Sequence, residues 1–151
     1  MSDHDAITNA LARYARGVDE RDFASVAALF TADATIDYEV EGGAVLKSSE
    51  LAGWLARAMT IFRMTQHHLG LPVIDVDGAT ATTRVPVIAT HVQQRRDGTE
   101  SSAILYGTYH HSWTRTADGW RIRTLRFDSQ HGTGTFLAPD QIRLFPAAPA
   151  R

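Results

Sequence analysis

The sequence contains no cysteine among its 151 residues. This absence excludes disulfide bonds, thiolate nucleophiles and zinc sites built from cysteine. It is typical of proteins that work in a reducing compartment, so we expect a cytoplasmic protein. Without covalent cross-links or cysteine-bound metal, its stability has to come from the packing of its core.

An excess of positive charge is also missing, because 15 Lys and Arg face 17 Asp and Glu, a formal net charge of -2. No basic field is available to attract nucleic acid or an anionic membrane. No stretch approaches the length of a membrane-spanning apolar run, and the start of the chain, Met1 to Asp5, lacks the basic and apolar segments of a leader. We expect neither nucleic acid nor membrane as a partner, and no cleaved leader.

The first third of the sequence has helical periodicity. Apolar residues recur every three or four positions over residues 5–18, which predicts an amphipathic helix. Asp22 is suited to cap a second, short helix. The period returns between Leu51 and Phe62 after Glu50, an acid in the first turn. We therefore predict three helices.

Strand patterns dominate the rest of the chain. Residues 34–40 form a first expected strand, and from Met64 onward the apolar period is two. Turn signals recur at three Asp-Gly pairs, which divides this part into four long antiparallel strands. Helices grouped before strands indicate the α+β class, and long twisted strands tend to curl. The four expected strands are residues 64–76, 79–95, 101–115 and 120–129.

A single domain is expected over residues 1–151, since this length suits one hydrophobic core. Its last part, residues 132–151, is a tail with several large apolar side chains. Such a tail is too apolar to remain in water. We expect it to pack on the core or on a neighbouring subunit.

The seven histidines are the main chemical resource of the chain, because imidazole titrates near neutral pH. Alternation along the strands sorts them by face. His67 shares its face with Leu69, and His91 shares its face with Val87 and Ala89. Both histidines are therefore expected to point into the interior.

Strand register extends this interior face. If Asp97-Gly98 is a two-residue turn, His91 lies opposite Ile104, and Tyr106 and His110 share its face. The same count at the next turn adds Leu125 and Phe127. The opposite face would then carry Tyr109, His111 and Trp113, which we assign to subunit contacts. A one-residue bulge in this strand would exchange His110 with His111.

Each inward histidine could instead be a core residue that is hydrogen-bonded to backbone or hydroxyl groups. Three histidines on one face argue against a purely structural role for all three, because every buried imidazole needs a hydrogen-bond partner. No close His-x-His pair or helical His-x-x-x-His pair is present, and no acid lies at ligand spacing, so no metal is expected. For Asp19, Asp37 and Tyr38 the pattern alone favours a solvated acid and an edge-strand pair.

Five segments of the sequence form a recognisable set, namely residues 14–19, 29–34, 36–38, 65–70 and 118–120. Through them the sequence resembles the SnoaL-like branch of the nuclear transport factor two superfamily over about residues 5–130. This resemblance implies a cone-shaped α+β fold, with a curved mixed or antiparallel sheet wrapped around three N-terminal helices and enclosing a pocket. In site layout the chain is similar to scytalone dehydratases and hexachlorocyclohexane dehydrochlorinases.

The resemblance implies an Asp-His dyad that removes a proton in an elimination. Asp19 corresponds to the acid of the dyad, and His67, in Thr-Gln-His, to the base. Tyr38 corresponds to the strand tyrosine of the dehydratases, and His91 approximately to their second histidine. His110 falls where they have an asparagine, and Val18 where they have a second tyrosine.

A cofactor-independent lyase of the dehydratase type is therefore the first hypothesis, with Asp19, His67, Tyr38, His91 and His110 as catalytic residues. Its substrate would be a small hydrophobic, cyclic or aromatic molecule. The alternatives are an isomerase or polyketide-cyclase-like enzyme with the same dyad, and a non-catalytic binding module. We expect a homodimer or homotrimer, and no cofactor. The expected substrate-binding residues are Tyr14, Phe30, Trp54, Leu69, Tyr106 and Phe127.

Overall fold

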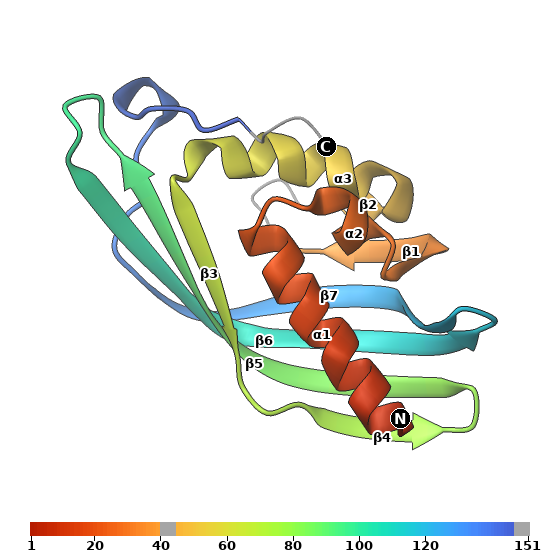
Figure 1. Cartoon of the computed structure of the whole chain (residues 1–151). Coiled ribbons are helices and arrows are strands. Elements are labelled where there is room, and N and C mark those ends of the chain that lie inside the picture. The colour runs from red at the N-terminus through yellow and green to blue at the C-terminus, as the bar shows by residue number, and fades with distance from the viewer. Residues whose placement is uncertain (40–44, 147–151) are drawn as a thin grey trace.

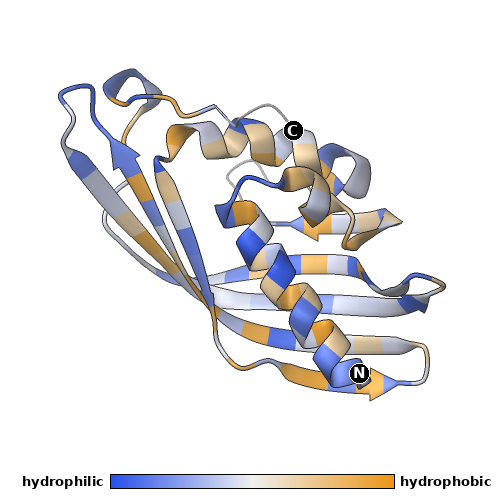
Figure 2. Ribbon diagram, in the orientation of Figure 1, coloured by the Kyte–Doolittle hydropathy of each residue, from blue (hydrophilic) through white to orange (hydrophobic). Residues whose placement is uncertain are grey.

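The structure is a computed structural model that describes residues 1–39 and 45–146. Its longest helix, α1 (Asp3–Asp19), begins at Ser2, whose hydroxyl accepts a hydrogen bond from the Asp5 backbone N–H. The Asp5 carboxylate accepts one from Ser2 N in return, which completes a capping box. Hydrophobic and hydrophilic residues are interleaved along α1 (Figure 2), and its apolar side is buried in the core, as the periodicity predicts.

Two further helices complete the helical layer. α2 (Phe23–Ala27) is capped by Asp22, which accepts from the Ser25 N–H, so this predicted cap is confirmed. α3 (Ser48–Ala58) begins where the Glu50 carboxylate accepts from Lys47 N at 2.8 Å. A 3-10 turn, η1 (Met59–Ile61), follows it. None of the helices in the described ranges is both long and apolar enough to cross a membrane.

The strands form one curved, unclosed sheet, and the helices lie against its inner side (Figure 1). The order is β2-β1-β7-β6-β5-β3, and β4 also pairs with β5. β1 and β7 are parallel and the other pairs antiparallel. The expected α+β cone with a mixed sheet is confirmed. The strands are β1 (Phe30–Asp37), β2 (Leu46–Lys47), β3 (Met64–Leu69), β4 (Val73–Asp77), β5 (Thr80–Gln94), β6 (Glu100–Thr116) and β7 (Gly119–Thr133).

Two strand predictions need correction. The first strand begins at Phe30 rather than residue 34 and ends at Asp37, and residue 40 lies outside the described residues. The predicted strand 64–76 is divided into β3 and β4 at Gly70-Leu71-Pro72. Gly70 donates its N–H to the Pro86 carbonyl, and Pro72 has no N–H to continue the ladder. The chain leaves β5 at this point and rejoins it as β4.

The turn between β5 and β6 overturns the predicted register. Arg95 N donates to the Thr99 carbonyl at 2.8 Å, so the loop has one residue more than a two-residue turn, with Gly98 at φ 93°. His91 therefore lies opposite Ala103 and not Ile104. Because side chains alternate along a strand, a slip of one residue moves every side chain of β6 to the other face.

Consequently, the assignment of Tyr109, His111 and Trp113 to subunit contacts is wrong. These side chains are buried in the core, with at most 5% of their surface exposed. In β7 the register shifts next to Ser112, and this bulge keeps Leu125 and Phe127 on the inner face as predicted. The homodimer or homotrimer stays a prediction, without an assigned face.

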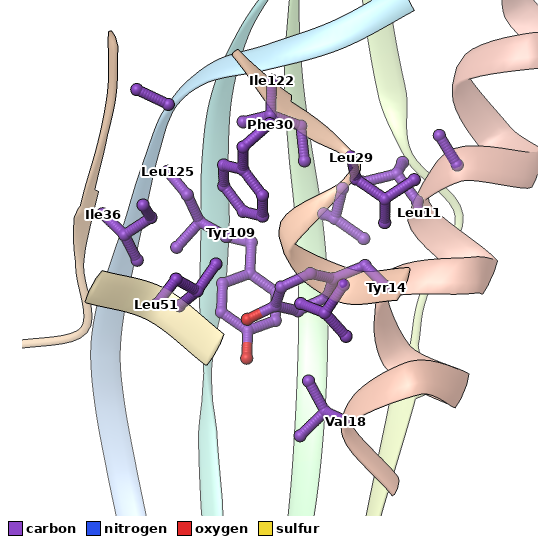
Figure 3. Close-up of a cluster of buried hydrophobic side chains, with 14 of the residues drawn as sticks. Leu11, Tyr14, Val18, Leu29, Phe30, Ile36, Leu51, Tyr109, Ile122 and Leu125 are labelled. Carbon is purple, nitrogen blue, oxygen red and sulfur yellow. The ribbon is translucent and has the colours of Figure 1, made fainter. Parts of the chain in front are cut away.

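The core lies between α1, α3 and the inner face of the sheet. Figure 3 shows Tyr14 of α1 and Tyr109 of β6 side by side, with Phe30 and Leu125 above them. The tail packs back on the same chain. Ile142 is 3% exposed and pairs with Arg95, and the backbone of Leu137 both donates to and accepts from the Gln93 amide.

Candidate active site

A cavity of about 150 Å³ lies between α1, α3 and the inner sheet face. Most of its wall is apolar or aromatic, and its polar groups come from histidines and tyrosines. A wall of this kind suits a small organic molecule, with a few polar groups to orient it. The lining residues are Tyr14, Val18, Tyr38, Trp54, Leu55, Met59, His67, Ala89, His91, Leu105, Tyr109 and Phe127.

Asp19 and His67 meet at one side of this cavity. Asp19 is the last residue of α1, and His67 lies in the middle of β3. The Asp19 Oδ1 atom is 2.7 Å from His67 Nδ1, so the expected contact between the two side chains is confirmed. The side chains are 8% (His67) and 20% (Asp19) exposed. The pair is thus largely shielded from solvent, which strengthens its electrostatic interaction.

Further hydrogen bonds fix the Asp19 carboxylate. Its Oδ2 accepts from the His67 backbone N–H at 2.8 Å, and its Oδ1 also accepts from the Thr65 hydroxyl at 3.1 Å. A carboxylate surrounded by donors is held as an acceptor, so the Nδ1 of His67 carries its hydrogen toward Asp19. The Nε2 lone pair is then free to accept a proton.

Tyrosine hydroxyls form the second polar group of the cavity. The hydroxyls of Tyr14 and Tyr38 are 2.7 Å apart, and the ring of Tyr14 packs edge-on against that of Tyr109, with centroids 5.7 Å apart. Tyr38 stacks on Trp54, with ring centroids 5.3 Å apart and planes at 22°. Burial raises the pKa of Tyr14, Tyr38 and Tyr109 well above that of a free tyrosine. The hydroxyls therefore remain protonated donors at neutral pH.

His91 lies next to the dyad. Its ring centroid is 6.0 Å from that of His67, and its ring also packs against Phe62 and Phe136. Burial lowers the pKa of His91 to about 4, and the neighbouring His67 adds to this shift. His91 is thus a neutral imidazole near pH 7, able to donate or accept one hydrogen bond at each nitrogen.

The structure separates the remaining predicted residues. Trp54, Tyr14 and Phe127 line the cavity as assigned. His110 and Tyr106 do not, because the corrected register places them on the outer face of β6, where His110 Nε2 is 3.8 Å from Asp128 Oδ2.

Two further residues assigned to the substrate-binding surface do not line this cavity. Phe30 is buried in the core and packs edge-on against Tyr14, at 6.3 Å between ring centroids. Leu69 lines a separate open groove of about 580 Å³ between α1 and the β3–β4 connection. Asp19 and His67 also line this groove, so the dyad lies between the groove and the cavity.

Sequence reasoning missed Tyr109 and Leu105, which line the cavity from β6. Had the sequence been interpreted with a three-residue turn from Arg96 to Gly98, the resulting register would have placed both side chains on the inner face. It also missed Thr65, which is two residues before His67 and therefore on the same strand face. In residues 1–39 and 45–146 no group of three or more His, Cys, Asp or Glu side chains is arranged to hold a metal ion.

The fold and the site define a protein with a small-molecule cavity inside a cone of helices and curved sheet. The chain belongs to the SnoaL-like domain family, whose profile matches residues 1–126. It is 33% identical over 123 residues to an uncharacterized protein of Mycobacterium tuberculosis, covering 81% of this chain and 82% of that protein. An uncharacterized protein of Mycobacterium bovis matches to the same extent.

Solved structures share the fold. The Kfla4162 protein of Kribbella flavida is 27% identical, with a TM-score of 0.79 over 87% of this chain and 93% of that one. A provisionally named scytalone dehydratase of Novosphingobium aromaticivorans is 25% identical, with a TM-score of 0.75 over 97% and 94%. A type 2 hexachlorocyclohexane dehydrochlorinase is 20% identical, with a TM-score of 0.74 over 89% and 93%, a likeness of fold alone.

Proposed function

We propose that the protein is a cofactor-independent lyase that eliminates water from a small cyclic molecule. The observation that carries this proposal is the Asp19–His67 contact at the wall of an apolar cavity that also holds the Tyr14–Tyr38 hydroxyl pair. A base and a neutral hydrogen-bond donor in one closed site are what proton removal next to a carbonyl requires. The name of the structurally similar scytalone dehydratase is consistent with such chemistry.

In the proposed reaction, His67 Nε2 takes a proton from the carbon next to the substrate carbonyl. Negative charge develops on the carbonyl oxygen and is stabilised by the Tyr38 hydroxyl, while Asp19 stabilises the imidazolium. The electron pair of the broken C–H bond then forms a carbon–carbon double bond as the C–O bond to the β-hydroxyl breaks. The imidazolium returns the proton to the departing hydroxide, so water leaves and His67 is neutral again. His91 is the second donor available to the leaving oxygen.

The cavity also restricts the substrate. Its volume of about 150 Å³ is similar to that of an engineered protein cavity that binds benzene, which corresponds to a single ring. Its lining contains neither Lys nor Arg among the described residues, so no cation is present to balance a carboxylate or phosphate on the substrate. We therefore propose a neutral, single-ring ketone with a hydroxyl on the β carbon.

The test follows single-ring β-hydroxy ketones by mass spectrometry, with loss of one water as the expected change. His67→Ala should abolish the reaction. The matched control is His110→Ala, because His110 is a histidine on the outer face of the sheet and should leave the rate unchanged. A His67→Ala variant with a near wild-type rate would eliminate the enzyme hypothesis and favour a binding module.

An isomerase or cyclase is the second candidate, because a base and a tyrosine donor stabilise an enolate whether or not a group leaves afterwards. Deuterium exchange separates it from the lyase. In D₂O, an isomerase would shift the double bond of a single-ring β,γ-enone into conjugation and incorporate deuterium at the γ carbon without losing water. The lyase would show loss of water from the β-hydroxy ketone.

A further inference from the structure

Arg21 and Thr65 form a hydrogen-bonded chain behind the dyad. Arg21 Nη1 donates to the Thr65 hydroxyl at 2.7 Å, and the Thr65 hydroxyl donates to Asp19 Oδ1 at 3.1 Å. Thr65 is 3% exposed. Arg21 has a φ of 65°, a left-handed conformation that is uncommon for a residue with a side chain. This backbone conformation occurs where the chain turns from α1 toward α2, and the Arg21 side chain extends to β3.

The protons of this chain can be counted. A guanidinium has only donors, so the Thr65 oxygen must be the acceptor of the Arg21 bond. The single hydroxyl hydrogen of Thr65 is then left to donate, and Asp19 Oδ1 is the acceptor within reach. Asp19 is thereby required to accept, which in turn requires a hydrogen on His67 Nδ1. Each group fixes the hydrogen position of the next, from Arg21 to His67.

We propose that Arg21 and Thr65 are positioning residues that fix the tautomer of His67 and tune its basicity through Asp19. This inference rests on the proposed function of His67 as a base. The Thr65 hydrogen bond and the Arg21 charge both draw negative charge away from the Asp19–His67 contact. Loss of either would therefore strengthen the attraction between Asp19 and a protonated His67.

A purely structural role is the competing explanation. Arg21 also donates to the carbonyls of Val18 at 3.0 Å and Phe62 at 3.4 Å, and so joins the end of α1 to the start of β3. Loss of these bonds would lower stability and lower the rate at every pH alike. It would not change the pH at which His67 titrates, so the titration separates the two explanations.

The other ionisable groups near His67 keep their charge in these variants. Arg16 of α1 and Glu20, which follows α1, form an exposed ion pair at 2.9 Å, so their charges largely cancel. His91, on β5, is neutral above about pH 4. The buried tyrosines of the cavity remain protonated. Arg21 is thus the one charge that the variants remove, and Asp19 keeps its charge in both of them.

The experiment is an NMR titration of the His67 ring nitrogens in the full-length protein, supported by the pH profile of turnover. Thr65→Val removes the hydroxyl and Arg21→Met removes the charge. Each should raise the titration midpoint of His67 by about half a pH unit to one unit, the shift expected for the loss of one hydrogen bond. Thr65→Ser keeps the hydroxyl and should titrate like the wild type.

The matched controls are Thr108→Val, a buried hydroxyl on the outer side of the sheet, and Arg115→Met, an ion-paired arginine that contacts Asp3. Neither should move the midpoint. An unchanged midpoint in a folded Thr65→Val protein would overturn the proposal, and so would an equal shift in Thr108→Val. If Arg21→Met does not fold, the His67 midpoint of Thr65→Val is sufficient to test the proposal.

The outcome is separable from that of the proposed function. A protein without turnover on any ketone, whose His67 midpoint still moves in Thr65→Val, would support the hydrogen-bonded chain and contradict the lyase. If turnover depends on His67, but the His67 midpoint and the pH profile are unaffected in both variants, the result would support the lyase and contradict the proposed role of Arg21 and Thr65.

Discussion

Replacing Asp19 by asparagine tests the dyad with little change in shape. The amide oxygen can still accept from the His67 backbone N–H, now at 2.8 Å from Oδ2. The amide NH₂ then faces His67 Nδ1, where it has to donate. Donation to Nδ1 moves the imidazole hydrogen to Nε2, the nitrogen that must be free to take the substrate proton. Asp19→Asn therefore gives the wrong tautomer as well as removing the charge.

Asp19→Asn should affect turnover far more than it affects the stability of the fold. In a serine protease triad, the same acid-to-amide change lowers kcat by about 10⁴-fold, and we expect a loss of about 10³-fold to 10⁴-fold here. The loss of unfolding free energy should be modest by comparison. The amide nitrogen no longer accepts from the Thr65 hydroxyl or strengthens its partners by charge, which costs about 1 to 3 kcal/mol of unfolding free energy. This is a fraction of the usual stability of about 5 to 15 kcal/mol.

The assay pairs turnover of the β-hydroxy ketone with urea unfolding of the same preparation. Asp19→Asn should be folded and nearly inactive, while a rate within about tenfold of the wild type would refute the reasoning. Asp37→Asn is the control, because Asp37 is a carboxylate at the end of β1 that caps the local turn at Glu39 and does not line the cavity. It should retain its rate.

Three further predictions concern the same molecule. His67→Ala and the double variant with Asp19→Ala should lose nearly equal activity, since the pair acts as a unit, and additive losses in turnover would contradict the dyad. Tyr38→Phe should raise the activation free energy by about 1 to 3 kcal/mol, and an unchanged rate would exclude it as the donor. The pKa of His91, about 4, and of His111, about 3, lie below the unfolded value of 6.5 because both imidazoles are buried. As the pH falls below 6.5, protons bind the unfolded state first, so stability is lost progressively down to the folded pKa values. From pH 7 to 5 the two histidines together should cost about 4 kcal/mol in urea unfolding, and a flat profile would show that they are not buried as neutral groups.

The sequence predicted the helices well because their information is local. The apolar stripe of α1 and the Asp22 cap need only neighbours within one or two turns. The inward orientation of His67 and His91 was equally local, since alternation along a single strand decides it. Strand breaks were less predictable. The interruption at Gly70 depends on the proximity of Pro86, which is 16 residues away in the chain.

The contact between Asp19 and His67 was predicted only through the resemblance to known enzymes. Periodicity alone favoured a solvated acid for Asp19 at the end of its helix. Nothing local links a helix terminus to a strand 48 residues later. The packing of α1 against β3 brings them together, and it brings Arg21 and Thr65 together in the same way.

By itself, the sequence determined the class of fold, the number of helices and the inner face of β3 and β5, because helix and strand periods are properties of consecutive residues. The tertiary structure decided which residues of β6 enter the cavity. One extra residue in the turn before Thr99 exchanged His110 and Tyr106 for Tyr109 and Leu105, since the side chains of a strand alternate with a period of two. The turn conformation is selected by the pairing of both whole strands and by the burial of their inner faces. That selection is a property of the folded chain, and it is why Tyr109 rather than His110 lies beside the tyrosine pair.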